Sequence, residues 1–192
     1  MDRDPPSILV LAAGASSRMR GEDKLLREVD GTPMILRAVR AACAAARSVV
    51  VALPPGSARG AWLTDLPARR VEVAARSMSA SIAAGVAACP SGAVMLHLAD
   101  MPEIDAGDLT VLCEAWRGTV APVLRAASST GRPGHPIVFD AALRPALAAL
   151  RGDVGARALL NGRAVALRRL RGDRALVDLD TPEDWAAWQH RR

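Results

Sequence analysis

The pattern of apolar and polar positions along the chain predicts strands and helices in alternation. Short apolar runs rich in branched residues at 7–13, 48–53 and 93–99 are typical of buried strands. Apolar and small residues recur at helical spacing over 34–46, which is typical of an amphipathic helix. By the same criteria we expect further helices at 58–66, 79–89, 105–116, 141–150, 154–160 and from 182 onward, further strands at 70–74, 119–124, 137–139, 164–170 and 175–179, and a loop at 125–133.

This alternation predicts an α/β fold with three layers (α/β/α), in which helices cover both faces of a mostly parallel sheet. The chain has 192 residues and no internal repeat, so we expect a single domain over 1–192. In such sheets ligands bind beyond the carboxyl ends of the strands. The loops that follow the strands at 7–13 and 93–99 are therefore the places to look for chemistry.

Composition and charge narrow the class of protein. No apolar stretch approaches the roughly 18 residues of a membrane span, and the first six residues hold two acids and two prolines where a signal peptide has a basic patch. The three cysteines have no metal-like spacing. We therefore expect a cytoplasmic protein with no membrane partner and no cysteine-bound metal.

The net charge of +5 favours anionic partners, but its distribution argues against nucleic acid. The arginines are scattered, no basic run reaches five residues, and only 3% of the residues are aromatic. The chain has a single lysine, Lys24, and it falls in the one glycine-rich loop near the N-terminus. A nucleotide or an anionic metabolite fits this pattern better than a polynucleotide.

The first loop has the composition of a phosphate-binding loop. Small residues follow the strand, and Gly14 permits the positive φ that points successive backbone N–H groups at an anion. Arg18 and Lys24 add two cations. The loop is neither a P-loop nor a dinucleotide fingerprint, so we predict a triphosphate site; the alternative is an ordinary turn with solvent-facing cations. The residues expected at the nucleotide are Leu11, Ala12, Ala13, Gly14, Arg18 and Lys24.

Asp100 ends the strand at 93–99 and is the expected metal ligand. Mg²⁺ prefers one or two carboxylates together with phosphate oxygens and water. Asp105, with Asp108 three residues on, forms a capping box for the following helix, so Asp100 has no structural task. Capping in the same way explains 181–184 but leaves Asp178 and Asp180 unexplained. We expect one of these two, Asp180 in preference, to be a second ligand.

The motifs together resemble the nucleotidyltransferases of the molybdenum cofactor pathway, the MobA-like NTP transferases, and the resemblance runs nearly end to end. It implies a Rossmann-like, nucleotide-diphospho-sugar-transferase-like fold. Ala13 in place of glycine resembles the cytidylyltransferase branch, which includes accessory proteins of xanthine and aldehyde dehydrogenases. Arg20, interposed before Gly21, departs from the family pattern. The motifs are LAAGASSRM at 11–19, GEDK at 21–24, GTP at 31–33, SAS at 79–81 with Gly85, DMP at 100–102, GHP at 134–136, GDVGAR at 152–157 and DLDTPED at 178–184.

The resemblance also implies roles for residues outside the two loops. It implies nucleotide contacts at Ser79 and Ser81, and acceptor contacts at His135, Asp153 and Arg157. His135 follows the loop at 125–133 in a stiff Gly-His-Pro setting. For 153 and 157, local capping and a solvated arginine are an equal alternative.

The expected reaction is a Mg²⁺-dependent transfer of CMP from CTP to the phosphate of molybdopterin, with release of pyrophosphate and with Arg18, Lys24 and Asp100 as the catalytic residues; Mn²⁺ is an alternative metal. A phosphate nucleophile needs no general base, and the chain offers no convincing Ser/His/Asp or Cys/His set. His97, inside an apolar strand, is expected to be a satisfied core histidine. Two alternatives stay open: transfer from another nucleotide such as GTP or to another phosphate acceptor, and a non-catalytic carrier that inserts the cofactor into a xanthine or aldehyde dehydrogenase-type apoenzyme.

Overall fold

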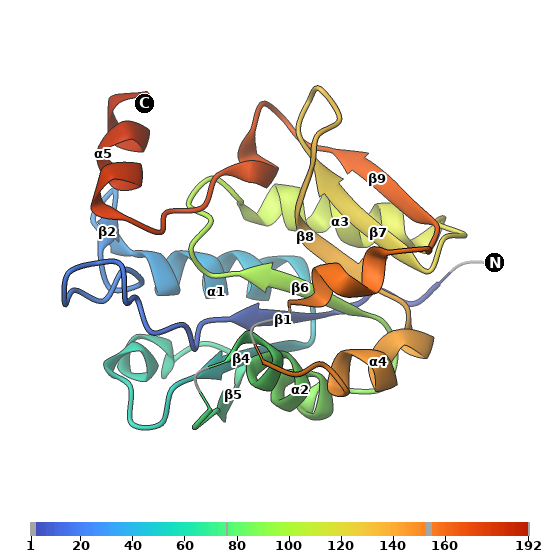
Figure 1. Cartoon of the computed structure of the whole chain (residues 1–192), viewed down its shortest axis with the longest axis horizontal. Coiled ribbons are helices and arrows are strands. Elements are labelled where there is room, and N and C mark those ends of the chain that lie inside the picture. The colour runs from blue at the N-terminus through green and yellow to red at the C-terminus, as the bar shows by residue number, and fades with distance from the viewer. Residues whose placement is uncertain (1–2, 76, 153–154, 192) are drawn as a thin grey trace.

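A twisted β-sheet forms the centre of the molecule. The computed structural model describes residues 3–75, 77–152 and 155–191, and within these the sheet has seven strands in the order β5-β4-β1-β6-β8-β7-β9 (Figure 1). All neighbouring pairs are parallel except those made by β8, which is antiparallel to both β6 and β7. The strands are β1 (Ser7–Leu11), β4 (Val49–Leu53), β5 (Arg69–Glu72), β6 (Val94–Leu98), β7 (Val123–Ala127), β8 (Pro133–Phe139) and β9 (Val165–Arg169).

Helices cover both faces of the sheet, as the alternation of elements predicts. Helices α1 (Met34–Ala45) and α3 (Ala106–Arg117) pack together on one face, and α2 (Met78–Ala88) and α4 (Arg144–Ala148) on the other. The C-terminal helix α5 (Pro182–His190) adds two tryptophans to the core on the α1 side. The 3-10 segments are η1 (Ala58–Leu63), η2 (Ala141–Leu143), η3 (Ala156–Leu160) and η4 (Arg174–Leu176), and β2 (Glu28–Val29) pairs with β3 (Thr32–Pro33) in a small hairpin.

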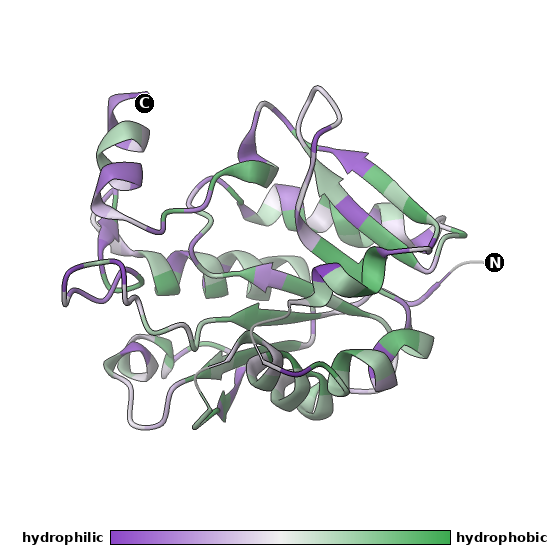
Figure 2. Cartoon of the chain, viewed as in Figure 1, coloured by the Kyte–Doolittle hydropathy of each residue, from purple (hydrophilic) through white to green (hydrophobic). Residues whose placement is uncertain are grey.

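The core is divided by the sheet, because alternate side chains of a strand point to opposite faces. In β1, Ile8 and Val10 join the core under α1 and α3, whereas Leu9 joins the core under α2 and α4. The strands β1, β4 and β6 are accordingly mostly hydrophobic, apart from a hydrophilic stretch near the end of β6, and hydrophilic residues gather in the loop after β1 and on α5 (Figure 2). Among the helices that the structure describes, none is long and apolar enough to cross a membrane.

The structure confirms the predicted mostly parallel α/β sheet and corrects several elements around its β8 edge. The strand expected at 119–124 lies at 123–127, and the strand expected at 137–139 begins at 133. Both ends of the expected loop at 125–133 are therefore strand, joined by a tight turn. Serine, glycine and proline in this stretch indicate the turn, and β7 and β8 pair right up to it.

The region after β8 contains less regular structure than the sequence predicts. Residues 175–179 form no strand: η4 packs against β8, and the chain then crosses toward the end of β6, where Leu179 N–H donates to the Asp100 carbonyl oxygen. The helix expected at 141–150 divides into η2 and α4, and that at 154–160 is the 3-10 turn η3. The hairpin of β2 and β3 was not expected, although its Asp-Gly turn is a hairpin signal.

Gly85 lets helix α2 pack directly on strand β1, which predicts that a larger residue destabilises the protein. A Cβ at Gly85 would overlap the side chain of Leu9, which is fully buried. Overpacking costs about 1–3 kcal/mol, more than the roughly 1 kcal/mol that alanine gains in helix propensity. We expect Gly85→Ala to lower the free energy of unfolding in denaturant titrations. Gly118→Ala is the control, because a Cβ there would meet nothing within 4 Å; equal stability of the two variants would contradict the prediction.

Candidate functional site

Lys24 bridges two aspartates at the carboxyl end of the sheet. Its Nζ lies 2.5 Å from Oδ2 of Asp100 and 2.6 Å from Oδ1 of Asp180. The lysine side chain is 11% exposed, so the ammonium is largely withdrawn from water and depends on these two carboxylates for compensation. The single lysine of the chain is therefore not a surface cation.

The fold brings these three residues together from distant parts of the chain. Lys24 ends the loop after β1, and Asp100 follows β6, the neighbour of β1. Asp180 lies just before α5, next to the backbone hydrogen bond between Leu179 and Asp100. Asp105 caps α3 in a capping box with Asp108, as predicted, so Asp100 does not cap that helix.

A cavity of about 330 Å³ lies above this cluster. Its rim is the loop at 13–18, and none of the backbone N–H groups of residues 13–18 donates a hydrogen bond to any group that the structure describes. Successive free N–H groups around a concave surface are typical of anion sites. We had expected the left-handed φ of this loop at Gly14, but it is found at Ser16 (+51°). A Cβ at Gly14 would meet nothing within 4 Å, so the rim of the cavity is open at that residue.

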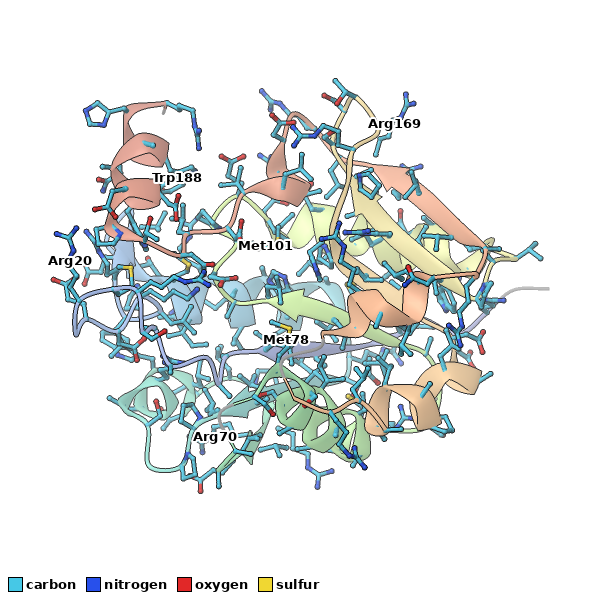
Figure 3. All side chains as sticks on the ribbon, in the orientation of Figure 1. Arg20, Arg70, Met78, Met101, Arg169 and Trp188 are labelled. Atoms are coloured by element: carbon cyan, nitrogen blue, oxygen red, sulfur yellow. The ribbon has the colours of Figure 1, made fainter. Side chains whose placement is uncertain are left out.

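The outer part of the same loop is tied to the C-terminal segment. Arg18 Nη1 lies 2.9 Å from Oδ2 of Asp180, and Arg20 Nη2 lies 2.7 Å from Oε1 of Glu183. Figure 3 shows Arg20 at the outer end of the loop, below the helix that carries Trp188. Arg18 is 71% exposed, so its side chain is available to a bound anion as well as to Asp180. Arg20, the residue interposed relative to the family pattern, thus contacts α5 rather than the cavity.

Most of the residues expected at the nucleotide line the cavity: Leu11, Ala13, Gly14, Arg18, Lys24, Ser81 and Asp100. Ala12 and Ser79 do not line it. Ala12 is buried, and its carbonyl oxygen accepts from Arg59; the Ser79 hydroxyl is buried against that of Ser77. Ser77 and Met78 line the cavity instead. The sequence signal for Ser77 and Met78 was their place at the start of α2, because the first residues of that helix face the loop.

The electrostatics of the cluster favour the charged form of Lys24 and disfavour the charged form of Asp178. Burial lowers the pKa of Lys24, but Asp100 and Asp180 outweigh this effect, so its net pKa lies above the ordinary value. Burial raises the pKa of Asp178, and the nearby Asp100 and Asp180 raise it further. Asp178 also lines the cavity, but it has no ion pair with Lys24. Asp180, and not Asp178, is therefore the carboxylate that shares Lys24 with Asp100.

The pair of carboxylates fits a divalent cation shared with a phosphate. Asp100 and Asp180 already hold one cationic group between them, and Oδ1 of Asp100 is buried with no hydrogen-bond partner. Within the described ranges, no group of three or more His, Cys, Asp or Glu side chains is placed to hold a metal. Two protein ligands completed by phosphate oxygens and water is the arrangement usual for Mg²⁺. Asp100 and Asp180 are the residues that would hold such an ion.

Arg125, His135 and Arg157 form a basic cluster whose members influence one another's charge. Burial, followed by Arg125 and Arg157, lowers the pKa of His135 to about 4, and burial together with Arg157 lowers the pKa of Arg125. His135 lies within β8 and not at the end of a loop, as we had expected. Arg157 is exposed on η3; Asp153 lies outside the described residues. Sequence reasoning missed Arg125, which it placed in the loop at 125–133.

His97 corrects another expectation. It is fully buried on β6, but neither of its ring nitrogens has a hydrogen-bond partner among the described groups, so it is not a satisfied core histidine. Burial, with a smaller contribution from His135, lowers its pKa to about 4. The imidazole is therefore neutral at pH 7.

The fold is that of an α/β protein whose mostly parallel sheet carries, at one edge, a loop of backbone N–H groups without acceptors among the described residues, next to Asp100 and Asp180. The chain belongs to the family of the MobA-like NTP transferase domain, whose model matches residues 8–172.

Known proteins resemble the chain at two levels. The 2-C-methyl-D-erythritol 4-phosphate cytidylyltransferase of Streptomyces avermitilis is 35% identical over 150 residues, which are 67% of this chain and 60% of that protein. The crystal structure of Rv0371c of Mycobacterium tuberculosis H37Rv in complex with manganese has a TM-score of 0.81 at 22% identity, covering 98% of this chain and 100% of that chain. A CMP:2-keto-3-deoxy-manno-octonic acid synthetase complexed with CTP has a TM-score of 0.76 at 13% identity, covering 98% of each chain. The two structures show the similarity of fold.

The burial of His97 predicts acid sensitivity. Its folded pKa of about 4 lies below the unfolded value of about 6.5, so between these values the unfolded chain binds a proton that the native chain does not. The free energy of unfolding should fall as the pH drops from 7 toward 4, by up to about 1.4 kcal/mol per pH unit for this group. We expect His97→Leu to flatten that slope in denaturant titrations, whereas the exposed His190→Gln leaves it unchanged. Parallel slopes for wild type and His97→Leu would contradict the assignment.

The contacts of Lys24 predict opposite effects of two substitutions on metal binding without nucleotide. Lys24→Met leaves Asp100 without an ion-pair partner and Asp180 with Arg18 alone, so Mn²⁺ should bind to the free protein at least about threefold more tightly. Asp100→Asn removes a ligand and should weaken Mn²⁺ binding at least about tenfold. Electron paramagnetic resonance titration of Mn²⁺ measures both. Glu114→Gln, on α3, is a control that should not alter the affinity; unchanged affinity in all variants would place the metal elsewhere.

Proposed function

We propose that this protein is a Mg²⁺-dependent cytidylyltransferase that transfers CMP from CTP to the terminal phosphate of molybdopterin or its metal-loaded form. The observation that carries the proposal is the Lys24, Asp100 and Asp180 cluster below a rim of free backbone N–H groups. One side of this cavity suits a cation and the other suits a polyphosphate. A nucleoside triphosphate with its metal needs both at once.

The triphosphate lies across the loop after β1 in this proposal. The N–H groups of residues 13–18, Arg18 and Lys24 hold its β- and γ-phosphates, and Asp100 and Asp180 hold Mg²⁺ or Mn²⁺. When bound, the metal neutralises charge on the α-phosphate. Lys24 then exchanges part of its contact with the two aspartates for a phosphate oxygen, which places a buried cation beside the leaving pyrophosphate.

The protein's part in the reaction is positioning and charge neutralisation. An oxygen of the acceptor phosphate forms a bond to the α-phosphorus, and the bond from that phosphorus to the bridging oxygen of pyrophosphate breaks. The acceptor is already anionic at neutral pH, so no proton has to be removed. The cavity lining accordingly contains no histidine or cysteine among the described residues. Pyrophosphate leaves with its charge against Arg18 and Lys24.

The cluster of Arg125, His135 and Arg157 supports an anionic acceptor. Both arginines lack an ion pair with any carboxylate that the structure describes, and each influences His135. The start of η3, which carries Arg157, comes close to the cavity: a Cβ at Gly155 would lie 3.0 Å from Sδ of Met78, which lines the cavity. Two uncompensated guanidinium groups in one place favour a phosphate. In this proposal the product passes to a xanthine or aldehyde dehydrogenase-type apoenzyme.

A different acceptor is the second candidate. The curated relative from Streptomyces is named for a sugar-alcohol phosphate, 2-C-methyl-D-erythritol 4-phosphate, and for cytidylyl transfer. Its name supports CTP as the nucleotide and leaves a small alcohol phosphate as the rival to molybdopterin. A carrier without catalysis is less well supported, because Lys24 and Asp100 are both present and in contact.

The proposed function predicts a preference among nucleotides. Ala13 lines the cavity at the border of the core under α2. In this proposal its methyl group, which glycine lacks, bounds the base pocket and leaves less room for a purine. We expect a preference for CTP over GTP of at least about tenfold in kcat/KM, within the range that one steric contact provides. Ala13→Gly should narrow this preference without reversing it.

Competition among CTP, GTP, ATP and UTP, with molybdopterin and with methylerythritol phosphate as alternative acceptors, measures this preference. Lys24→Ala serves as the control for background transfer, since it should lower turnover at least about tenfold. A preference for GTP would assign the guanylyl reaction, transfer to methylerythritol phosphate alone would assign the second candidate, and no transfer at all would favour the carrier.

A further inference from the structure

Arg59 is a buried arginine that contacts the loop after β1 from behind. It lies on η1, far from this loop in sequence, and its side chain is 4% exposed. Nη1 donates to the carbonyl oxygen of Ala12 at 2.5 Å, Nε to Oδ2 of Asp23 at 2.7 Å, and Nη2 to the hydroxyl of Ser16 at 3.3 Å. One guanidinium group therefore holds the beginning, the middle and the end of the loop.

Two of these contacts continue to Lys24. The Ser16 hydroxyl accepts from the backbone N–H of Lys24 at 3.3 Å, and Oδ1 of Asp23 accepts from the N–H of Leu25 at 3.0 Å. Arg59 thus fixes the side chains of Ser16 and Asp23, which accept hydrogen bonds from the backbone at Lys24 and Leu25. The side chain of Lys24, in turn, reaches Asp100 and Asp180.

The loop needs an external support because its own backbone is strained. Ser16 and Arg20 both have φ in the left-handed region, at +51° and +52°, which non-glycine residues rarely adopt. The backbone N–H groups of residues 13–18 also have no acceptor among the described residues, so they contribute nothing to holding the loop in its shape. Burying an arginine is itself costly unless it is well paired. The pairing of Arg59 is made entirely with this loop.

Arg144 shows what a purely structural arginine of this chain contacts. Its guanidinium donates to carbonyl oxygens at the end of α2, among them those of Val86 and Cys89, and it lies outside the cavity lining. Arg59 also donates to the backbone, but its partners belong to the loop that forms the cavity rim. Arg144, which is half-buried where Arg59 is buried, is therefore a control for the loss of an arginine that holds backbone away from the cavity.

We propose that Arg59 is a positioning residue for nucleotide binding: through Ala12, Ser16 and Asp23 it holds the loop in the shape in which its N–H groups face the cavity and Lys24 reaches the two aspartates. Arg59 does not touch the substrate. The proposal rests on the proposed function for the identity of the ligand, a nucleoside triphosphate, but the ordering of the loop is independent of it.

Two measurements on Arg59→Met test the proposal, with Arg144→Met as control. Hydrogen exchange without nucleotide should be faster at residues 13–24 in Arg59→Met and unchanged there in Arg144→Met. Calorimetric titration with CTP and Mg²⁺ should show affinity at least tenfold lower for Arg59→Met than for Arg144→Met. Arg59→Lys keeps the charge but loses the planar fork, so it should resemble Arg59→Met.

Kinetics separate positioning from general destabilisation. The effect of Arg59→Met on kcat should largely disappear in a Lys24→Met background, because it acts through that lysine. If Arg59→Met does not fold, Asp23→Asn, which removes one partner on a partly exposed side chain, should produce the same loop exchange and the same loss of affinity. Unchanged exchange at 13–24 in the folded variant would overturn the proposal. Absence of nucleotide binding by the wild type would instead overturn the proposed function.

Discussion

The ion pairs of one lysine with two aspartates are the constraint on which the site depends. Lys24, Asp100 and Asp180 come from three segments that meet at the carboxyl edge of the sheet. Each charge is withdrawn from water to some degree, and each is compensated by the others. Removing Lys24 would leave the largely buried carboxylate of Asp100 without an ion pair, which costs far more than an intact pair contributes. The cluster therefore fixes the relative positions of β1, β6 and the segment before α5.

Groups of opposite charge line different sides of the cavity around this cluster. Carboxylates gather at its floor, where burial and mutual repulsion raise the pKa of Asp178. Free N–H groups and Arg18 occupy the rim on the loop side. Arg125 and Arg157, without a carboxylate partner among the described residues, lie near His135, and the start of η3, which carries Arg157, comes close to Met78. A substrate with a metal, a polyphosphate and an acceptor phosphate would meet complementary charge at each end.

Local patterns identified much of this arrangement in advance. The capping box of Asp105 and Asp108 is a short-range motif, and recognising it left Asp100 without a structural role. The carboxyl ends of adjacent parallel strands meet at one edge, which placed the loop of Lys24 beside Asp100. The β8 region was predicted less well, because the pairing of β7 with β8 and β9 extends strands through residues whose composition is that of a turn.

The sequence by itself determined the fold class, and it indicated that the loop after β1 and Asp100 belong to one candidate site, since periodicity, small residues and caps act over a few positions. The tertiary structure decided that Asp180 and not Asp178 pairs with Lys24, that Arg59 supports the loop and that Arg125 joins His135. It also left the ring nitrogens of His97 without partners in the described core. These outcomes depend on which distant segments lie side by side, and this is set by the order of the strands and by the path of the chain after η4. Side-chain contacts between distant segments have no local signature in the sequence.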